Sequence, residues 1–262
     1  SPADSAWAAR DRWVVVIGID EYAAAGTPAR RYGAEDARAV EAFLRSPAAG
    51  SIPPARIRTL INGEATRAGI RAALSGFLAQ AGREDVVLVY LTGTGAPDPS
   101  HPNAAFILPH DAPAAPTAAT AISAEWLAET LAELDVHQKI LLADVLYAGE
   151  RKGNRPQQNL VHRTLVRTTG PQKGGIVAIT SAGDAATSEE GAQSGGGHGV
   201  FTHHVLAGLG GAGDDDRDGV ITLAELVKHA RERVEGATRG QQKPGVSAAA
   251  YDRSWPMAVR AS

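Results

Sequence analysis

The stretch Val86-Val87-Leu88-Val89-Tyr90-Leu91-Thr92-Gly93-Thr94-Gly95 decides the fold, because an unbroken apolar run enters a turn of small residues. A second stretch repeats this design in Lys139-Ile140-Leu141-Leu142-Ala143-Asp144-Val145-Leu146-Tyr147-Ala148-Gly149. Continuous apolar runs of this kind are typical of parallel strands that are buried on both faces. We therefore predict two neighbouring strands, Val86–Leu91 and Ile140–Ala143, each of which ends in a turn.

Strand and helix patterns alternate along the rest of the chain, which is typical of a parallel sheet covered by helices on both faces. Trp13–Ile19 is the most continuous β-branched run, and we expect it to be a central strand. The predicted strands are Trp13–Ile19, Arg56–Ile61, Val86–Leu91, Phe106–Pro109, Ile140–Ala143, Ile176–Thr180 and Trp255–Val259, and the predicted helices are Gly33–Leu44, Thr66–Gln80, Ser123–Leu134, Phe201–Leu209 and Thr222–Val234.

The two turns resemble those of the caspase and metacaspase superfamily, which includes the bacterial caspase-like orthocaspases. Members of that superfamily end the first strand in Ser-Gly-His-Gly and the second in Asp-x-Cys-x-x-Gly. In this chain Thr94 stands at the histidine position and Leu146 at the cysteine position. The resemblance implies a three-layer α/β/α caspase-like fold with a mostly parallel sheet of about six strands. It also implies that the catalytic pair of the family has been replaced.

The replaced residues remove the chemistry of a cysteine peptidase. That chemistry needs a thiolate to attack the carbonyl carbon and an imidazole to manage the proton. Leu146 has no lone pair, Thr94 has an unactivated hydroxyl, and the whole chain contains no cysteine. We therefore predict a pseudo-peptidase with no catalytic residues. A hydrolase with a non-cysteine nucleophile on the same scaffold stays open as the alternative.

Several histidines could in principle assist such a nucleophile. Gly197-His198-Gly199 imitates the missing Gly-His-Gly, but it precedes an amphipathic run and is interpreted as a loop that leads into a helix. His101, His110, His203 and His204 show no ligand-like spacing, and we interpret them as ordinary structural residues.

The resemblance covers nearly the whole chain, so we predict a single caspase-like domain over residues 1–262. Similar segments are Gly18–Tyr22 and Gly33–Ala37 near the start, and Ile179–Ala182 and Gly199–Thr202 near the end. Residues 1–148 then correspond to the large-subunit half and residues 175–262 to the small-subunit half. Between them, residues 149–174 form a basic linker loop, interpreted as solvated and mobile, with a plug of the acidic cleft or a processing site as the alternatives.

Two acidic residues form the pocket for a substrate arginine or lysine in metacaspase-like members, and by motif position these are Asp36 and Asp144. Two aspartates that converge on a cleft favour a guanidinium, because buried carboxylates need a compensating cation. Asp36 can instead favour the positive end of its helix, and Asp144 can hold a turn. Gly93 and Gly95 leave room for backbone amides to approach a carbonyl oxygen. The predicted pocket could therefore bind without cutting.

An acidic loop late in the chain, Asp214 to Glu225, matches the calcium-loop template. The oxygen ligands would come from Asp214, Asp216, Asp218, the Val220 carbonyl and Glu225, around a structural calcium ion. Thr222 and Glu225 also match a capping box, in which Glu225 reaches back to the helix start instead of a metal. Both interpretations stay open, and no cofactor is required by either.

The composition excludes several classes of partner. Lys plus Arg is 26 against 29 Asp plus Glu, and a net charge of −3 gives no field that attracts nucleic acid or an anionic membrane. The chain starts without a basic, apolar signal region, and its apolar runs are too short to span a membrane. We expect a cytoplasmic domain, excised or trimmed from a longer protein, that regulates or binds a protein or peptide: an active caspase-like homologue or a basic segment.

Overall fold

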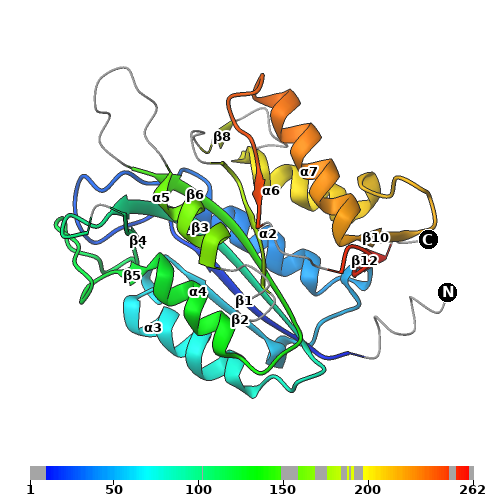
Figure 1. Ribbon diagram of the computed structural model, residues 1–262, viewed down its shortest axis with the longest axis horizontal. Coiled ribbons are helices and arrows are strands. Elements are labelled where there is room, and N and C mark those ends of the chain that lie inside the picture. Colours follow the sequence, from blue (N-terminus) through cyan, green and yellow to red (C-terminus); the bar gives the residue numbers. More distant parts are fainter. Residues whose placement is uncertain are drawn as a thin grey trace.

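Five parallel strands form the centre of one large sheet in the described part of the chain (Figure 1). The computed structural model describes residues 10–101, 103–148, 159–168, 176–183, 188, 190–191, 197–247 and 252–259. The parallel strands are β1 (Arg12–Gly18), β2 (Ile57–Ile61), β3 (Val86–Pro97), β6 (Gln138–Tyr147) and β7 (Ile176–Thr180). The order across the sheet is β11-β7-β6-β3-β1-β2, where β11 (Gly245–Val246) is antiparallel to β7.

Helices cover both faces of this sheet, and the alternation of side chains along β1 shows why. Val14 and Val16 pack in the core under α2 (Gly33–Leu44), α6 (Val200–Ala207) and α7 (Leu223–Ala237). Val15 and Ile17 pack in the core under α3 (Arg67–Arg71), α4 (Ala124–Glu133) and α5 (Leu160–Thr168). Because strand side chains alternate between faces, one apolar strand serves both cores. The predicted three-layer α/β/α fold with a mostly parallel sheet is confirmed.

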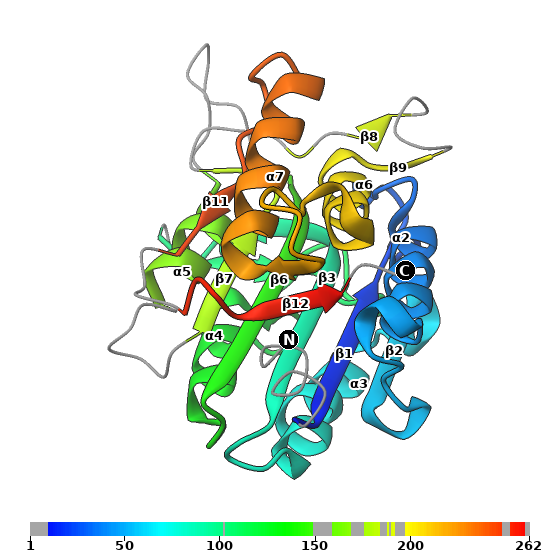
Figure 2. The same cartoon turned by 90° about the vertical axis from the view of Figure 1, so that its right-hand side faces the viewer.

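Short elements complete the structure. β4 (Ala105–Ile107) pairs with the end of β3 and with β5 (Ile122–Ser123), β8 (Glu190–Gly191) pairs with β9 (His198–Gly199), and β10 (Val220–Thr222) pairs with β12 (Pro256–Val259). Figure 2 shows β12 lying across the sheet below α6 and α7. Single helical turns lie at Pro47–Ala49, Pro54–Arg56, Asn62–Glu64 and Leu78–Gln80, and wide turns at Ala72–Phe77 and Gly208–Ala212.

Most predicted elements are present, with the predicted caps. Thr66 accepts the backbone N–H of Gly69 at the start of α3, and Ser123 accepts that of Trp126 at the start of α4. The helix predicted over Thr66–Gln80 is α3 followed by the wide and single turns. The strand predicted at Trp255–Val259 is β12, which belongs to a small separate sheet rather than to the main one. No helix among the described residues has the length and apolarity that a membrane span requires.

The two strands that decide the fold are longer than predicted. β3 and β6 stay paired from Val86 opposite Gln138 to Gly95 opposite Tyr147, straight through the residues predicted to be turns. The prediction that these strands end at Leu91 and Ala143 is therefore wrong. Glycine weakens a strand but does not prevent it where a partner strand continues to pair.

The linker prediction is wrong in part. Residues 149–158 and 169–174 lie outside the described residues, whereas Leu160–Thr168 form helix α5 rather than a loop. Val161 and Leu165 are buried one helical turn apart and anchor α5 on the sheet. Arg163 and Arg167, which fall within the predicted linker, lie on this helix.

Candidate functional site

The two replaced catalytic positions lie side by side at the carboxyl ends of β3 and β6. Thr94 is the register partner of Leu146. Thr94 is fully buried; its hydroxyl donates to the Pro28 carbonyl over 2.7 Å, and its N–H donates to the Tyr22 hydroxyl over 2.8 Å. Leu146 offers only hydrocarbon to the neighbouring space. Thr94 therefore ties down the loop between β1 and α2, with no imidazole beside it in the described contacts.

Gly93 and Gly95 lie inside the paired strand rather than in an open turn. A Cβ on Gly95 would lie 2.6 Å from Val161 Cγ2 and 3.0 Å from Val145 Cγ1, so the absent side chain makes room for α5 on the sheet. A Cβ on Gly93 would lie 3.3 Å from the Tyr22 hydroxyl. Both glycines are therefore explained by close packing, because a side chain at either position would crowd its neighbours. Their role beside a bound carbonyl stays a prediction.

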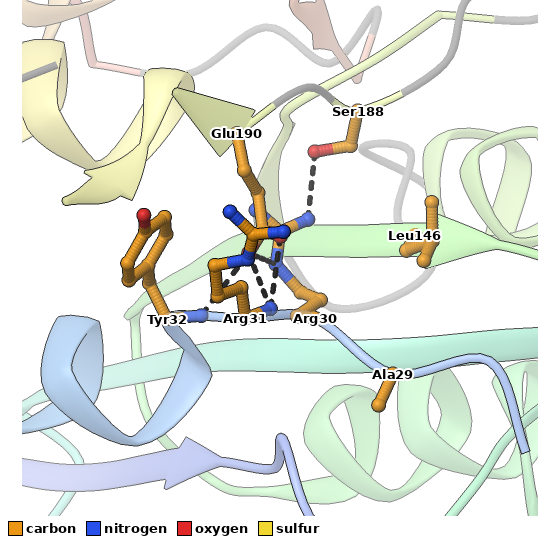
Figure 3. Close-up of a pocket in the computed structure, with 7 residues that line it drawn as sticks. All are labelled: Ala29, Arg30, Arg31, Tyr32, Leu146, Ser188 and Glu190. Carbon is orange, nitrogen blue, oxygen red and sulfur yellow. Dashed lines mark hydrogen bonds and ion pairs between the residues drawn. The ribbon is translucent and has the colours of Figure 1, made fainter. Parts of the chain in front are cut away.

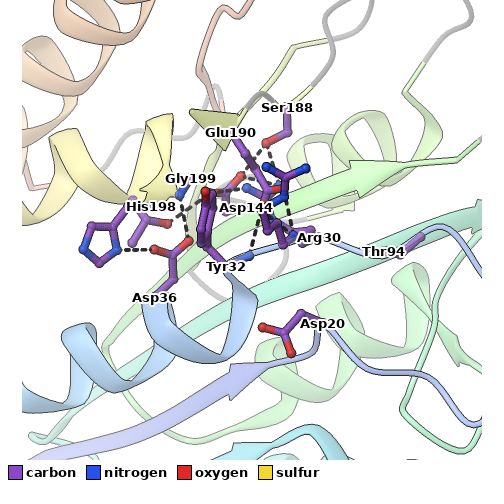
Figure 4. Close-up of polar contacts among 12 residues, drawn as sticks. Asp20, Arg30, Tyr32, Asp36, Thr94, Asp144, Ser188, Glu190, His198 and Gly199 are labelled. Atoms are coloured by element: carbon purple, nitrogen blue, oxygen red, sulfur yellow. Dashed lines mark hydrogen bonds and ion pairs between the residues drawn. The ribbon is translucent and has the colours of Figure 1, made fainter. Parts of the chain in front are cut away.

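Asp36 and Asp144 come together above the carboxyl end of β6 (Figure 4). Asp36 lies in the first turn of α2 and Asp144 lies on β6, and both are fully buried. Gly199 lies between them: a Cβ built there would be 2.6 Å from Asp144 Oδ2 and 3.0 Å from Asp36 Oδ2. The two aspartates singled out by sequence are therefore neighbours in space. The side chain that lies against Asp144 is Arg30.

Arg30 fills the space that the acidic pair surrounds. Its Nη1 lies 3.1 Å from Asp144 Oδ1 and its Nη2 donates to Asp144 Oδ2 over 3.2 Å. Its Nη1 also donates to Ser188 Oγ over 2.8 Å. Only 1% of the Arg30 side chain is exposed. The predicted pocket for an arginine of another molecule thus contains an arginine of this chain.

Hydroxyl groups and a third carboxylate complete the surroundings of Asp144 and Arg30. Ser188 Oγ donates to Asp144 Oδ1 over 2.6 Å, and Thr202 Oγ1 donates to Asp144 Oδ2 over 3.0 Å. Glu190 Oε1 lies 3.3 Å from Arg30 Nε, an ion pair without hydrogen-bond alignment. Burial by itself lowers the pKa of Arg30, but the charges of Asp144 and Glu190, with smaller contributions from other groups, outweigh it and raise this pKa. The guanidinium is therefore permanently charged.

Asp36 is held separately from Arg30. Its Oδ1 lies 2.7 Å from His198 Nδ1, and its Oδ2 accepts the backbone N–H of Gly199 over 3.0 Å. Burial, and secondly the charge of Asp144, raises the pKa of Asp36 to about 7. Burial and these same carboxylates also raise the pKa of Tyr90, whose hydroxyl lies 2.7 Å from Thr202 Oγ1. Asp36 is therefore a carboxyl group that titrates near neutral pH.

Sequence reasoning missed Arg30, Ser188, Glu190 and the role of His198. The sequence predicts that His198 is a loop residue, whereas it lies in β9 and contacts Asp36. The pair Arg30-Arg31 directly before the helix that carries Asp36 was the available signal for a cation at this site.

A cavity of about 320 Å³ opens beside Leu146 (Figure 3). Its lining combines the hydrocarbon of Ala29 and Leu146 with polar groups of the arginine-bearing loop and of Ser188 and Glu190. Glu190 accepts the backbone N–H groups of Arg31 and Tyr32, so it fastens this loop to β8. The cavity is thus bordered by the loop that inserts Arg30.

The acidic loop forms the predicted capping box at the start of α7. Thr222 and Glu225 bond each other's backbone N–H groups, over 3.3 and 2.9 Å, and Glu225 Oε1 accepts the Asp215 N–H over 3.0 Å. The carboxylates of Asp214, Asp216 and Asp218 have oxygens within 4.8 Å of one another. Val220 begins β10 and its N–H bonds Asp218 Oδ1. Glu225 therefore serves the helix start, and calcium binding stays a prediction.

The family model for the caspase domain matches residues 11–254. Among solved structures, protein GSU0716 from Geobacter sulfurreducens is similar with a TM-score of 0.66 and 16% identity, over 95% of this chain and 97% of that chain. Caspase-1 from Spodoptera frugiperda is similar with a TM-score of 0.58 and 12% identity, over 92% of this chain and 88% of that chain. At these identities the likeness concerns the fold alone. No curated protein matches this chain significantly. Because the family model spans most of the sequence, this chain belongs to the caspase domain family.

Proposed function

We propose that this chain is a non-catalytic caspase domain that acts by binding a protein or peptide. The observation that supports this most strongly is the pairing of Thr94 with Leu146 at the end of β3 and β6. A thiol cannot be supplied from elsewhere, because the chain has no cysteine. The hydroxyl of Thr94 donates to the Pro28 carbonyl, so it is committed to holding a loop.

The partner we propose is an active caspase-like homologue or a basic segment of another protein. The cavity beside Leu146 supports a binding role, because it combines hydrocarbon with a few polar groups, as ligand sites do. Its position at the carboxyl ends of parallel strands is also the usual place for a binding site in open α/β sheets. Regulation of an active homologue is the role that this combination of an inert centre and an open cavity serves best.

The alternative is a hydrolase with a different nucleophile, and the described residues give it little support. A hydroxyl meets an imidazole where Thr180 Oγ1 lies 2.5 Å from His162 Nδ1. Thr180 is 3% exposed and also donates to the Ala182 carbonyl, so it is neither accessible nor free to attack. A nucleophile needs both an activating base and room for the scissile carbonyl. This pair instead joins α5 to β7.

Two measurements test the proposal. First, the purified domain is incubated with peptides that carry Arg, Lys or Asp before the scissile bond, and we expect no hydrolysis above buffer. Second, the domain is titrated into an active caspase-like peptidase. The rate of peptide hydrolysis by that peptidase should change and reach a plateau as the domain saturates it. A Leu146→Glu variant, which places a charge in the cavity, is the matched control and should lose this effect. Hydrolysis that disappears in Leu146→Glu, or an unchanged rate of the active enzyme, would contradict the proposal.

A further inference from the structure

A second cavity, of about 290 Å³, lies beside α4 and α5, the helices that cover the sheet face away from α2. It shares no lining residue with the cavity beside Leu146. Its walls are the start of β4, the first turn of α4 and one side of α5, three elements that contact one another. Its volume is at the lower end of the range of small-molecule sites, which begins at about 300 Å³. The cavity is therefore separate from the acidic pair and has room for a small ligand.

The packing of α5 fixes which of its side chains face this cavity. Val161 and Leu165 are buried in the core that the sheet shares with α4 and α5. Arg163, Thr164 and Arg167 lie on the polar side of the helix and line the cavity. Because buried side chains hold α5 against the sheet, these polar groups are in position before a ligand arrives.

Two guanidinium groups stand one helical turn apart in this cavity. Arg163 and Arg167 are four residues apart on α5, and like charges at this spacing destabilise a helix. Residues 151–183 include six Lys or Arg and no Asp or Glu, so no carboxylate close in sequence compensates these charges. Arg167 takes part in no ion pair of the described residues. An anion with several oxygens suits such a pair, because each guanidinium can donate two parallel N–H bonds.

A carboxylate in the same cavity restricts the kind of anion. Glu125 lines the cavity from the first turn of α4, and it takes part in no ion pair with any described residue. It therefore leaves the positive charge of α5 in place. Its charge opposes a bare anion such as inorganic phosphate. Its oxygens accept hydrogen bonds, however, so hydroxyl groups on the ligand turn this neighbour into a partner.

Neutral hydrogen-bonding groups complete the lining. Ser123 Oγ accepts the Trp126 N–H over 3.3 Å, which leaves the hydroxyl proton of Ser123 for a ligand. Thr164 adds a second hydroxyl, and Asn103 adds an amide that both donates and accepts. The cavity thus combines two cations, one acceptor carboxylate and three neutral polar groups.

We propose that this cavity binds a small phosphate monoester that carries hydroxyl groups, a sugar phosphate or a mononucleotide. A phosphate monoester has a charge of about −1.5 to −2 at pH 7, which matches the two guanidinium groups of Arg163 and Arg167. Glu125 accepts hydrogen bonds from the hydroxyl groups of the same ligand. The inference goes beyond the proposed partner binding and does not depend on it, because the two cavities have no residue in common.

The first experiment measures binding to the wild-type protein by calorimetry. The probes are ribose 5-phosphate, adenosine 5′-monophosphate, ribose and inorganic phosphate. We expect at least one of the two phosphate esters to bind at least tenfold more tightly than both ribose and inorganic phosphate. The tighter of the two esters shows whether a sugar phosphate or a nucleotide is preferred. Two esters that bind no more tightly than inorganic phosphate overturn the inference.

Three variants test the assigned roles with the tighter ester. Arg167→Gln should weaken its binding at least tenfold, whereas Arg38→Gln, which changes an exposed arginine on α2, should leave it unchanged. Glu125→Gln should bind inorganic phosphate more tightly and should prefer the ester by a smaller factor. Arg167 is exposed and glutamine is a good helix former, so Arg167→Gln should keep the wild-type unfolding midpoint. Wild-type affinity in Arg167→Gln, or an unchanged preference in Glu125→Gln, contradicts the proposal.

A labelling experiment locates the ligand without any substitution. Phenylglyoxal modifies accessible arginines, and mass spectrometry of peptides reports the extent at each position. A saturating concentration of the tighter ester should reduce the modification of Arg167 at least fivefold and leave that of Arg38 unchanged. Equal modification of Arg167 with and without the ester would place the ligand elsewhere and overturn the inference.

Discussion

Thr94 and Leu146 are register partners on the adjacent parallel strands β3 and β6, at the two positions where the family resemblance places a histidine and a cysteine. Their side chains have different tasks. Thr94 is fully buried and holds the arginine-bearing loop through Pro28, whereas Leu146 borders the cavity. Thr94 is therefore part of the packing that holds a loop, and Leu146 forms part of an apolar wall.

The hydroxyl of Thr94 should stabilise the protein. Thr94→Val keeps the shape but leaves the Pro28 carbonyl without its donor, and we expect a loss of about 1 kcal/mol in the free energy of unfolding. Thr92→Val is a close control, because Thr92 is equally buried on the same strand and its hydroxyl has no hydrogen-bond partner among the described residues. It should be neutral or stabilising. Urea unfolding of both variants makes the comparison, and equal losses would remove the role given to Thr94.

The carboxyl group of Asp36 should make stability depend on pH. Burial and the charge of Asp144 raise the pKa of Asp36 from 3.8 to about 7, so the folded chain holds a proton that the unfolded chain releases. This stabilisation is full below the unfolded pKa and is lost as the pH rises through about 7. We expect Asp36→Asn to show a smaller loss of stability between pH 5 and pH 8 than the wild type.

Glu35→Gln provides the control for this pH dependence, because Glu35 is exposed on the same turn of α2. Its unfolding midpoint should follow the wild type at every pH. If Asp36→Asn also follows the wild type from pH 5 to pH 8, then the carboxyl group of Asp36 is not the group that retains a proton in the folded chain.

Gly95 should be required for packing rather than for open backbone amides. A methyl group there would lie 2.6 Å from Val161 Cγ2 on α5 and 3.2 Å from the Phe106 carbonyl oxygen. We expect Gly95→Ala to lower the free energy of unfolding by about 1–3 kcal/mol through overpacking. Gly76→Ala, where the new methyl group meets nothing within 4 Å, should leave stability unchanged or raise it. Denaturant unfolding that places both variants at wild-type stability would contradict the packing role.

The capping box at α7 should contribute to stability with or without calcium. Glu225→Gln weakens the bonds to Thr222 and to the Asp215 N–H, and we expect a loss of about 1 kcal/mol. The same loss in calcium and in chelator supports the cap. A melting temperature of the wild type that rises with calcium, and does not rise in Asp216→Asn, would assign the loop to the cation instead.

The sequence was sufficient for the fold and for half of the site. The apolar runs predict β3 and β6. The family resemblance predicts that Asp36 and Asp144 lie in one pocket, and the two side chains are neighbours in the structure. The occupant of the site was not predictable, because Arg30 is 114 residues from Asp144 and 158 from Ser188 in the chain. Local pattern cannot show which cation meets a carboxylate over such separations. The turn predicted at Gly93 and Gly95 is wrong for a related reason. Pairing of these residues with β6 overrides the preference of glycine for turns.

The most direct test of the central claim is peptide hydrolysis by rigorously purified wild-type protein and its Asp144→Asn variant. Peptides with Arg, Lys or Asp before the scissile bond cover the substrates that the resemblance implies. We predict no turnover by either protein, because the chain has no thiol and the described residues place no accessible, activated hydroxyl at the end of β3 and β6. Turnover by the wild type that Asp144→Asn abolishes would show that this caspase domain is an enzyme.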